Sequence, residues 1–209
     1  MILSRIRNVA LILGVSSLLA GCSLFGSSPP SHFYILAALP DSVAAGASEG
    51  VFNRGVGVGP VGVPEYLDRP QIVLRSGRNE VGLSELDKWA EPLEDGVLRV
   101  LGENLAKLFG TDRIRRYPWS TSSGLDYRIS LRIERFDGEP GEDVMLVTRW
   151  RIRGGESRGR VLAEGHSRIE KPVQGMSHRS LVKAMSAAIG ELSLELADTL
   201  RTLDADPTL

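Results

Sequence analysis

The sequence predicts an α+β fold in a single domain, with two long helices packed on one face of a mostly antiparallel sheet. Two segments, 127–134 and 144–153, alternate apolar and polar residues, which is typical of strands with one buried face. Two other segments, beginning near Pro92 and Ser177, carry apolar residues at helical spacing. The chain therefore runs through several strands, a helix, several strands and a helix. This order favours α+β over the alternating α/β class.

The strand predictions depend on which side chains share a face. In 127–134 the apolar residues Tyr127, Ile129, Leu131 and Ile133 alternate with Arg128, Ser130, Arg132 and Glu134. In 144–153 one face carries Leu146, Trp150 and Ile152, and the other carries Arg149, Arg151 and Arg153. The Gly-, Pro- and acid-rich segment between them predicts a hairpin connection. Further strands are expected at 32–39, 54–63, 71–75, 80–83, 114–119 and 160–170, and a loop at 41–50.

Both helices carry their own start and stop signals. Pro92 opens the first and Gly110 ends it, the usual asymmetry of proline at the start and glycine past the end. Ser177 is a good N-cap for the second, whose apolar stripe consists of Leu181, Met185, Ile189, Leu192, Leu196, Leu200 and Leu203. Core packing is the default role of this stripe, but the helix is longer than one small sheet requires. Leu192, Leu196 and Leu200 are therefore also self-assembly candidates, which would pack on a neighbouring protomer.

The first residues predict a lipoprotein signal. Two arginines precede a short apolar run that ends in small residues, as in a secretory signal peptide over residues 1–21. The run is shorter than the roughly 20 residues of a membrane-spanning helix. Leu-Ala-Gly-Cys at 19–22 resembles a bacterial lipobox. That resemblance implies cleavage before Cys22, an S-diacylglyceryl group on its thiol and acylation, for example by palmitate, of the new α-amine. Two or more acyl chains anchor a protein stably.

Residues 22–31 are expected to be a short lipidated tether, because small residues and prolines cannot build a core. The domain is then expected to occupy residues 32–209. Ser23 stands where an aspartate usually retains a Gram-negative lipoprotein in the inner membrane. Attachment to the outer-membrane lipid bilayer, on its periplasmic face, is therefore expected.

Composition limits the classes of function. The chain has 209 residues, a formal net charge of −1 and one cysteine. The part after the signal suffices for one domain with its own core. No clustered basic excess is present, so no nucleic-acid partner is expected. With Cys22 lipidated no disulfide remains, and the fold must depend on packing alone.

Motifs for catalysis, a cofactor or a metal are missing or lack their context. Residues 57–62 match G-x-G-x-x-G, but Pro60 and Pro64 contradict the strand–helix context of a dinucleotide site. A glycine-rich strand with a bend or bulge is favoured instead. The three histidines are scattered without ligand spacing, and no G-x-S-x-G is present. We therefore expect no enzyme activity, no cofactor and no metal.

Two surfaces remain as candidates for recognition. The first consists of Arg128, Arg132, Arg149, Arg151 and Arg153, which form either the solvated side of the sheet or a surface for acidic lipid headgroups or a partner subunit. The second is the segment 64–70, which has a proline at each end and an aromatic residue beside a charged pair. It is either a structured loop that enters a strand or an exposed recognition loop.

Several blocks of the sequence together resemble one family. They are Pro-Glu-Tyr-Leu-Asp-Arg at 64–69 with Gln-Ile-Val at 71–73, Trp-Ala-Glu-Pro-Leu at 89–93, and the leucine-rich helix that follows. Phe-Tyr-Ile-Leu at 33–36, Tyr-Arg-Ile at 127–129 with Phe136, and the closing helix fit the same pattern. The chain resembles the PqiC (YmbA-like) family of ABC-type transport auxiliary lipoproteins over essentially its whole length after the signal.

The resemblance implies an outer-membrane lipoprotein that docks an MCE-domain (PqiB-like) protein, which spans the periplasm as a tunnel, and serves an inner-membrane transporter subunit indirectly. The implied task is traffic of lipid or another hydrophobic molecule and support of membrane integrity, with assembly as a homo-oligomeric ring. Candidate partner contacts are Pro64, Tyr66, Leu67, Asp68, Arg69 and Trp89. One alternative is an envelope assembly or secretion lipoprotein that chaperones an outer-membrane channel without handling lipid. Another is a tethered periplasmic hydrolase, for which no nucleophile and base are found in register.

Overall fold

A computed structural model describes residues 29–46, 52–119, 121, 123–155 and 159–206. Residues from Ser31 onward form one compact unit, and the residues of its hydrophobic core lie between Leu36 and Leu200. The expected signal peptide, Cys22 and the tether up to residue 28 lie outside the described residues.

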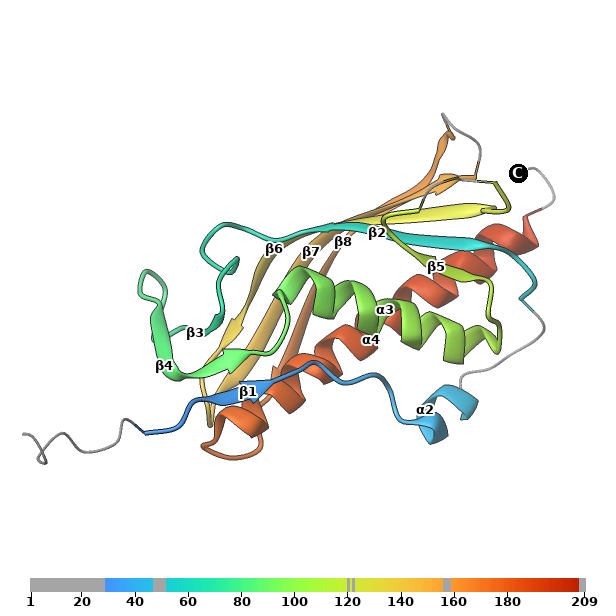
Figure 1. Cartoon of the computed structure of the whole chain (residues 1–209). Coiled ribbons are helices and arrows are strands. Elements are labelled where there is room, and N and C mark those ends of the chain that lie inside the picture. Colours follow the sequence, from blue (N-terminus) through green and yellow to red (C-terminus); the bar gives the residue numbers. More distant parts are fainter. Residues whose placement is uncertain (1–28, 47–51, 120, 122, 156–158, 207–209) are drawn as a thin grey trace, which may run out of the picture. The chain divides into compact units, whose positions relative to one another are not determined.

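The sheet has eight strands and is built around one long strand, β6 (Figure 1). β6 pairs antiparallel with β7, and β7 with β8, nearly from end to end. On its other edge β6 pairs in parallel with β2 and meets β3 at Gly138. The strands are β1 (His32–Tyr34), β2 (Val56–Gly62), β3 (Gln71–Leu74), β4 (Gly82–Trp89), β5 (Ile114–Arg116), β6 (Tyr127–Gly138), β7 (Asp143–Gly154) and β8 (Val161–Pro172).

The shorter strands make the sheet a mixed one. β4 pairs antiparallel with β3 but parallel with β1, and β5 pairs parallel with β2. The longest ladders are nevertheless antiparallel, in line with the predicted α+β fold. The bulge expected in residues 57–62 is confirmed, because the register of β2 on β6 shifts between Val58 and Val61.

Two long helices, α3 (Leu93–Phe109) and α4 (His178–Ala205), cover one face of the sheet as expected (Figure 1). α3 follows Pro92 and ends at Gly110, whose φ of 60° is left-handed and therefore favours glycine. At the start of α4 the hydroxyl of Ser177 accepts the N–H of Ser180, which confirms the predicted N-cap.

Three local predictions were wrong. A short helix, α2 (Asp41–Gly46), replaces the expected loop, and Lys107 Nζ lies 2.7 Å from the Asp41 carboxylate in its first turn. β4 continues to Trp89 beyond the expected end at residue 83, because pairing with β1 and β3 outweighs its polar composition. The strand expected at 32–39 ends at Tyr34, after which the chain leaves the sheet.

The apolar stripe of α4 belongs to the core. Leu192, Leu196 and Leu200 have no exposed surface, because α4 packs on β6, β7 and β8 and against α3. A side chain without exposed surface cannot contact a neighbouring protomer, so the structure contradicts these residues as self-assembly candidates. Within the described segments, no helix combines the length and apolarity that a membrane crossing requires.

Candidate functional site

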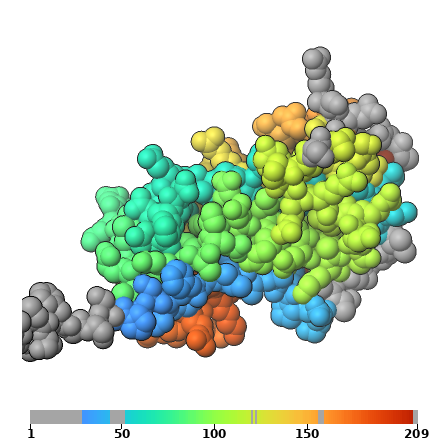
Figure 2. Space-filling model, viewed as in Figure 1, coloured from blue at the N-terminus to red at the C-terminus, as the bar shows by residue number. Residues whose placement is uncertain are grey.

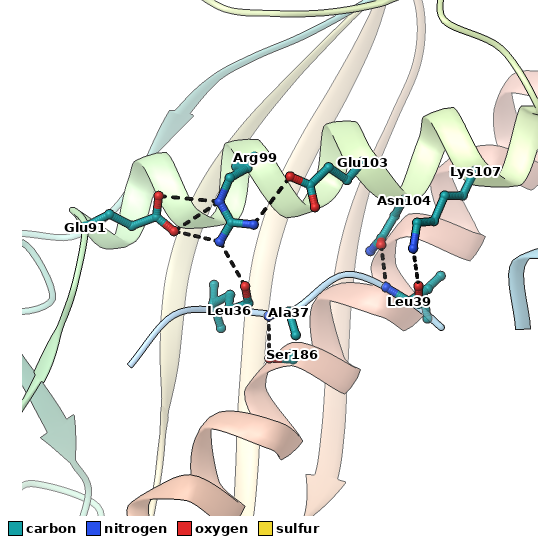
Figure 3. Close-up of polar contacts among 9 residues, drawn as sticks. All are labelled: Leu36, Ala37, Leu39, Glu91, Arg99, Glu103, Asn104, Lys107 and Ser186. Atoms are coloured by element: carbon teal, nitrogen blue, oxygen red, sulfur yellow. Dashed lines mark hydrogen bonds and ion pairs between the residues drawn. The ribbon is translucent and has the colours of Figure 1, made fainter. Parts of the chain in front are cut away.

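The chain enters the domain through a segment that lies between the two long helices (Figure 3). Residues 36–39, here called the strap, follow β1. Leu36 is buried, and its carbonyl oxygen accepts a hydrogen bond from Arg99 Nη2 at 2.8 Å. Arg99 is held by Glu91, whose Oε1 lies 2.7 Å from Nη2, and by Glu103 one turn along α3. Because a guanidinium has several donors, this one arginine joins the start of α3 to the strap.

Polar side chains of both helices fix the rest of the strap. The N–H of Ala37 donates to Ser186 Oγ on α4 at 3.0 Å. The N–H of Leu39 donates to Asn104 Oδ1 on α3 at 2.7 Å, and Lys107 Nζ donates to the Leu39 carbonyl at 2.9 Å. The bond to Asn104 is partly buried, whereas those to Ser186 and Lys107 are exposed. These contacts therefore define where the chain lies, although the strap belongs to no strand.

The strand before the strap is fastened by one carboxylate. Asp87 on β4 accepts from the hydroxyls of Tyr34 at 2.9 Å and Ser84 at 2.8 Å. The Nδ1 atoms of His32 and His178 lie 3.3 and 3.2 Å from the same carboxylate. Burial alone would raise the pKa of Asp87, but the hydrogen bonds from Ser84 and Tyr34 and the nearby histidines lower it. β1 is thus joined to both the sheet and α4.

The predicted recognition loop, residues 64–70, is a structured turn. The N–H of Leu67 donates to the carbonyl of Pro64 at 2.9 Å, and the N–H of Asp68 to that of Glu65 at 3.2 Å. The side chain of Leu67 is 2% exposed and holds the turn on the core. The hydroxyl of Tyr66 donates to Asp137 on β6 at 2.8 Å. The loop is therefore held at fixed points by its own buried side chains.

Asp137 is a fully buried carboxylate that collects donors from three segments. Arg75 on the β3 side donates to both its oxygens, at 2.8 and 3.0 Å, and Arg135 Nε lies 2.7 Å away. Burial would raise the pKa of Asp137, but hydrogen bonds from Arg75, Arg135 and Tyr66 outweigh burial and lower it. Burial and the bond to Asp137 raise the pKa of Tyr66 to about 12. The Tyr66 hydroxyl therefore remains a donor at neutral pH.

The loop and the start of α3 enclose a groove. The carbonyl of Pro70 accepts the N–H of Trp89 at 2.7 Å, which brings the two distinctive sequence blocks together. In Figure 2 the loop and the first turn of α3 lie side by side on the surface. The cavity has a volume of about 340 Å³ and is lined by Asp68, Arg69, Pro70, Trp89, Ala90, Glu91 and Pro92.

Arg69 lines this groove and is partly exposed. Its side chain makes no hydrogen bond with a described residue. Pro70 and Pro92 add rigid apolar walls, while Asp68 is exposed beside them. The groove can therefore receive a short segment that presents a carbonyl or carboxylate oxygen to Arg69.

The predicted contact residues divide into two groups. Asp68 and Arg69 line the groove at its surface, while Pro64 and Tyr66 are half-buried supports of the loop. Leu67 and Trp89 are largely buried and act mainly as anchors, with Trp89 at 7% exposure.

Sequence reasoning missed the residues that hold the strap, among them Arg99 and Asn104. Only Glu91 lay within a block that had been singled out. The signal in the sequence that could have identified them is a polar residue within the mainly apolar stripe of a helix.

Comparison with known proteins agrees with this architecture. Residues 34–197 match the family described as the ABC-type transport auxiliary lipoprotein component. Among curated proteins no match is found. The crystal structure of an uncharacterized protein is similar, with a TM-score of 0.67 and 17% identity over 82% of this chain and 99% of that chain. A DUF330 protein from Xanthomonas campestris has a TM-score of 0.67 and 15% identity, over 83% of this chain and 97% of its own.

A weaker similarity links the chain to a PelC dodecamer from Paraburkholderia phytofirmans. Its TM-score is 0.39 at 14% identity, over 69% of this chain and 92% of that chain, which is too low to relate the two folds. The likeness to the two other structures concerns the fold alone at these identities. The family match, in contrast, spans most of the chain, from β1 to the last turns of α4. This protein therefore belongs to the family of ABC-type transport auxiliary lipoprotein components.

Proposed function

We propose that this protein is a non-enzymatic subunit of a trans-envelope system that moves lipid or another hydrophobic molecule and supports membrane integrity. Cys22 anchors it in the outer membrane on the periplasmic side, and the domain docks an MCE-domain protein that spans the periplasm. The inner-membrane transporter subunit is reached through that partner. Membership of a transport auxiliary lipoprotein family supports this role, as does the lipobox-like sequence at 19–22.

The observation that carries the docking proposal is the groove at Arg69. Two blocks far apart in sequence meet there, through the hydrogen bond between Trp89 and Pro70. Arg69 is partly exposed, and its side chain makes no hydrogen bond with a described residue. A partner segment that presented a carbonyl or carboxylate oxygen would give the guanidinium a charge-assisted hydrogen bond.

Hydrogen bonds and ion pairs also link the groove to β1 and to the strap, the elements nearest the proposed membrane tether. Glu91 lines the groove and pairs with Arg99, which in turn holds the carbonyl of Leu36 in the strap. The N–H of Ala90 donates to the Tyr34 carbonyl in β1 at 2.9 Å. A partner bound in the groove would therefore contact Ala90 and Glu91, the residues that link the groove to β1 and, through Arg99, to the strap. A load between partner and membrane would pass through few residues.

Site-specific crosslinking tests the proposal. A photoreactive amino acid replaces Asp68, which is exposed at the groove, and in a matched control it replaces the exposed Glu170 on β8. Native envelopes are irradiated, and adducts are identified by mass spectrometry. The expected result is an MCE-domain protein crosslinked from position 68 and not from position 170. Recovery of only an outer-membrane or secretion channel would replace this proposal by the assembly-lipoprotein alternative.

The anchor and the proposed ring have their own tests. Cys22→Ala should release the protein from membranes, and a variant that still floats with lipid would contradict the anchor. The molar mass of the detergent-solubilised protein checks the homo-oligomeric ring, and a monomer at all concentrations would rule it out. Because Leu192, Leu196 and Leu200 are buried, contacts between ring protomers would have to use other surfaces.

A further inference from the structure

The face of the sheet that points away from α3 and α4 is rich in arginine. Along β6 and β7 the residues that alternate with the buried core positions point to this face. Among the described residues of β6, β7 and β8, the acids that share this face are Glu134, Asp137, Asp143, Glu164 and Glu170. We call this surface the arginine face, and its arginines are Arg128, Arg132, Arg149, Arg151, Arg153 and Arg168.

The strand register places like charges directly opposite one another. Arg132 on β6 faces Arg149 on β7, and Arg128 faces Arg153. Like charges at directly opposite positions destabilise a sheet. The side chain of Arg132 has no hydrogen bond or ion pair with any described residue that would offset this repulsion. The arrangement therefore favours an anion between the strands.

The surface is hollowed at this point. A cavity of about 630 Å³ is bordered by Ser130, Arg132, Arg149 and Arg151. Arg149 Nε lies 2.6 Å from Glu134, and Arg151 Nε 3.1 Å from Glu164. Each guanidinium has five N–H donors, so both arginines keep donors beyond these pairs. The hydroxyl of Ser130 adds a small neutral donor. The hollow thus offers more donors than the two glutamates use, which suits a phosphate group.

The neighbouring strand β2 presents glycines to the same face. The partners of Arg128 and Arg132 on β2 are Gly57 and Gly62, which have no side chains to cover the arginines. The ring of Trp119 lies against Gly57, 3.2 Å from where a Cβ atom would stand. Tryptophan is typical of surfaces that meet the headgroup region of a membrane. An aromatic side chain therefore borders the basic surface at this side of the domain.

We propose that the arginine face docks on the surface of a membrane that contains anionic phospholipids, and that Arg132, Arg149 and Ser130 receive a lipid phosphate. A protein partner fits less well, because the centre of a stable protein interface is depleted in charge, whereas this centre is charged. Clustered basic residues near a bilayer are attracted by anionic lipids. The eleven residues from Cys22 to His32 span at most about 35 Å, so an anchored domain stays within reach of the bilayer. This inference goes beyond the proposed transport role and does not depend on an MCE partner.

Vesicle flotation tests the inference on the chain from residue 22 with Cys22→Ser, which has no acyl chains. Vesicles contain phosphatidylcholine alone or with phosphatidylglycerol. The test variant is Arg132→Gln/Arg149→Gln/Arg151→Gln. The matched control is Arg78→Gln/Arg116→Gln/Lys183→Gln, which removes the same charge from exposed side chains elsewhere that make no hydrogen bond or ion pair with a described residue. Circular dichroism and thermal melting check that both variants fold.

We expect the parent chain and the control variant to bind the phosphatidylglycerol vesicles, and neither to bind pure phosphatidylcholine. The test variant should lose affinity by roughly 100-fold, from three arginines at the strength typical of basic residues near anionic lipid. High salt should release the parent chain. Equal losses in the test and control variants would show a general charge effect and overturn the proposal. A folded test variant that still binds vesicles but no longer recovers a protein partner from envelopes would assign this face to that partner instead.

Discussion

The backbone N–H of Leu39 donates to the side-chain oxygen of Asn104 at 2.7 Å, although the two residues are 65 positions apart in the sequence. The amide nitrogen of Asn104 in turn donates to Ser193 Oγ on α4 at 2.9 Å. Asn104 and Ser193 have no exposed surface. The strap, α3 and α4 therefore meet at one buried amide, whose oxygen accepts one hydrogen bond and whose nitrogen donates one.

Asn104→Leu should destabilise the domain by about 2 kcal/mol. The apolar side chain has a similar volume but leaves the N–H of Leu39 and the hydroxyl of Ser193 without this partner, and an unpaired buried polar group costs about 1–3 kcal/mol. Urea unfolding followed by circular dichroism measures the change. Thr202→Ala is the control, because Thr202 bonds only within an exposed turn of α4, and it should stay within about 0.5 kcal/mol. Equal effects of the two substitutions would contradict a special role for the buried amide.

Asp137→Asn should lower the free energy of unfolding by about 3 kcal/mol, more than Asn104→Leu does. The substitution keeps the shape of the side chain but removes the charge that Arg75 and Arg135 share in a buried position. Breaking a buried ion pair from one side typically costs 3–5 kcal/mol, and we take the lower end because both arginines retain some exposure. The same unfolding experiment measures it. A loss below about 1 kcal/mol would show that solvent already screens these pairs.

The low pKa of Asp137 predicts an acid-sensitive contribution to stability. Its pKa is below the ordinary 3.8 in the folded chain, because hydrogen bonds from Arg75 and Arg135 outweigh burial. The contribution is therefore complete above the unfolded value and is lost as pH falls through the folded pKa. The pKa of Asp87 is also lowered in the folded chain, so its contribution to stability is likewise lost at low pH. Unfolding midpoints of the parent chain and Asp137→Asn, compared from pH 7 down to 3, should converge at the acid end. A difference between the two midpoints that stayed constant with pH would show that the stabilisation by Asp137 does not depend on its ionisation.

The fold was largely predictable because its signals are local. Alternation in β6 and β7, the proline and glycine around α3, and the Ser177 cap are each read within a few residues. The strap was not predictable, because its backbone bonds go to side chains more than 60 positions away. Nothing in the local sequence of residues 36–39 distinguishes such a segment from a strand.

The candidate site was predictable in its residues but not in its geometry. The blocks at 64–69 and 89–93 stood out by composition, yet only the bond between Trp89 and Pro70 shows that they form one groove. Leu67 and Trp89 were expected at a surface, and burial assigns them mainly to support. Apolar residues in an unusual block are ambiguous from sequence, because core anchors and contact residues have the same chemistry.

Leu192→Asp tests the assignment of the α4 stripe to the core. A charge placed among buried apolar side chains should unfold the domain or destabilise it by about 4 kcal/mol or more. Ala187→Asp on the exposed side of the same helix is the control and should change stability little. Thermal melting compares the two. A Leu192→Asp protein that kept its melting temperature but lost self-association would return this stripe to an interface.

Arg69→Ala separates a binding residue from a structural one. The Arg69 side chain makes no hydrogen bond with a described residue, so its removal should leave stability within about 0.5 kcal/mol. Recovery of the partner in pull-downs from envelopes should nevertheless fall by roughly tenfold or more, the effect of losing one charged hydrogen bond. Tyr66→Phe is the contrasting variant: it removes the bond to Asp137 and should lower stability by about 1 kcal/mol. If Arg69→Ala melted early and kept its partner, the guanidinium would support the loop and the docking groove would lie elsewhere.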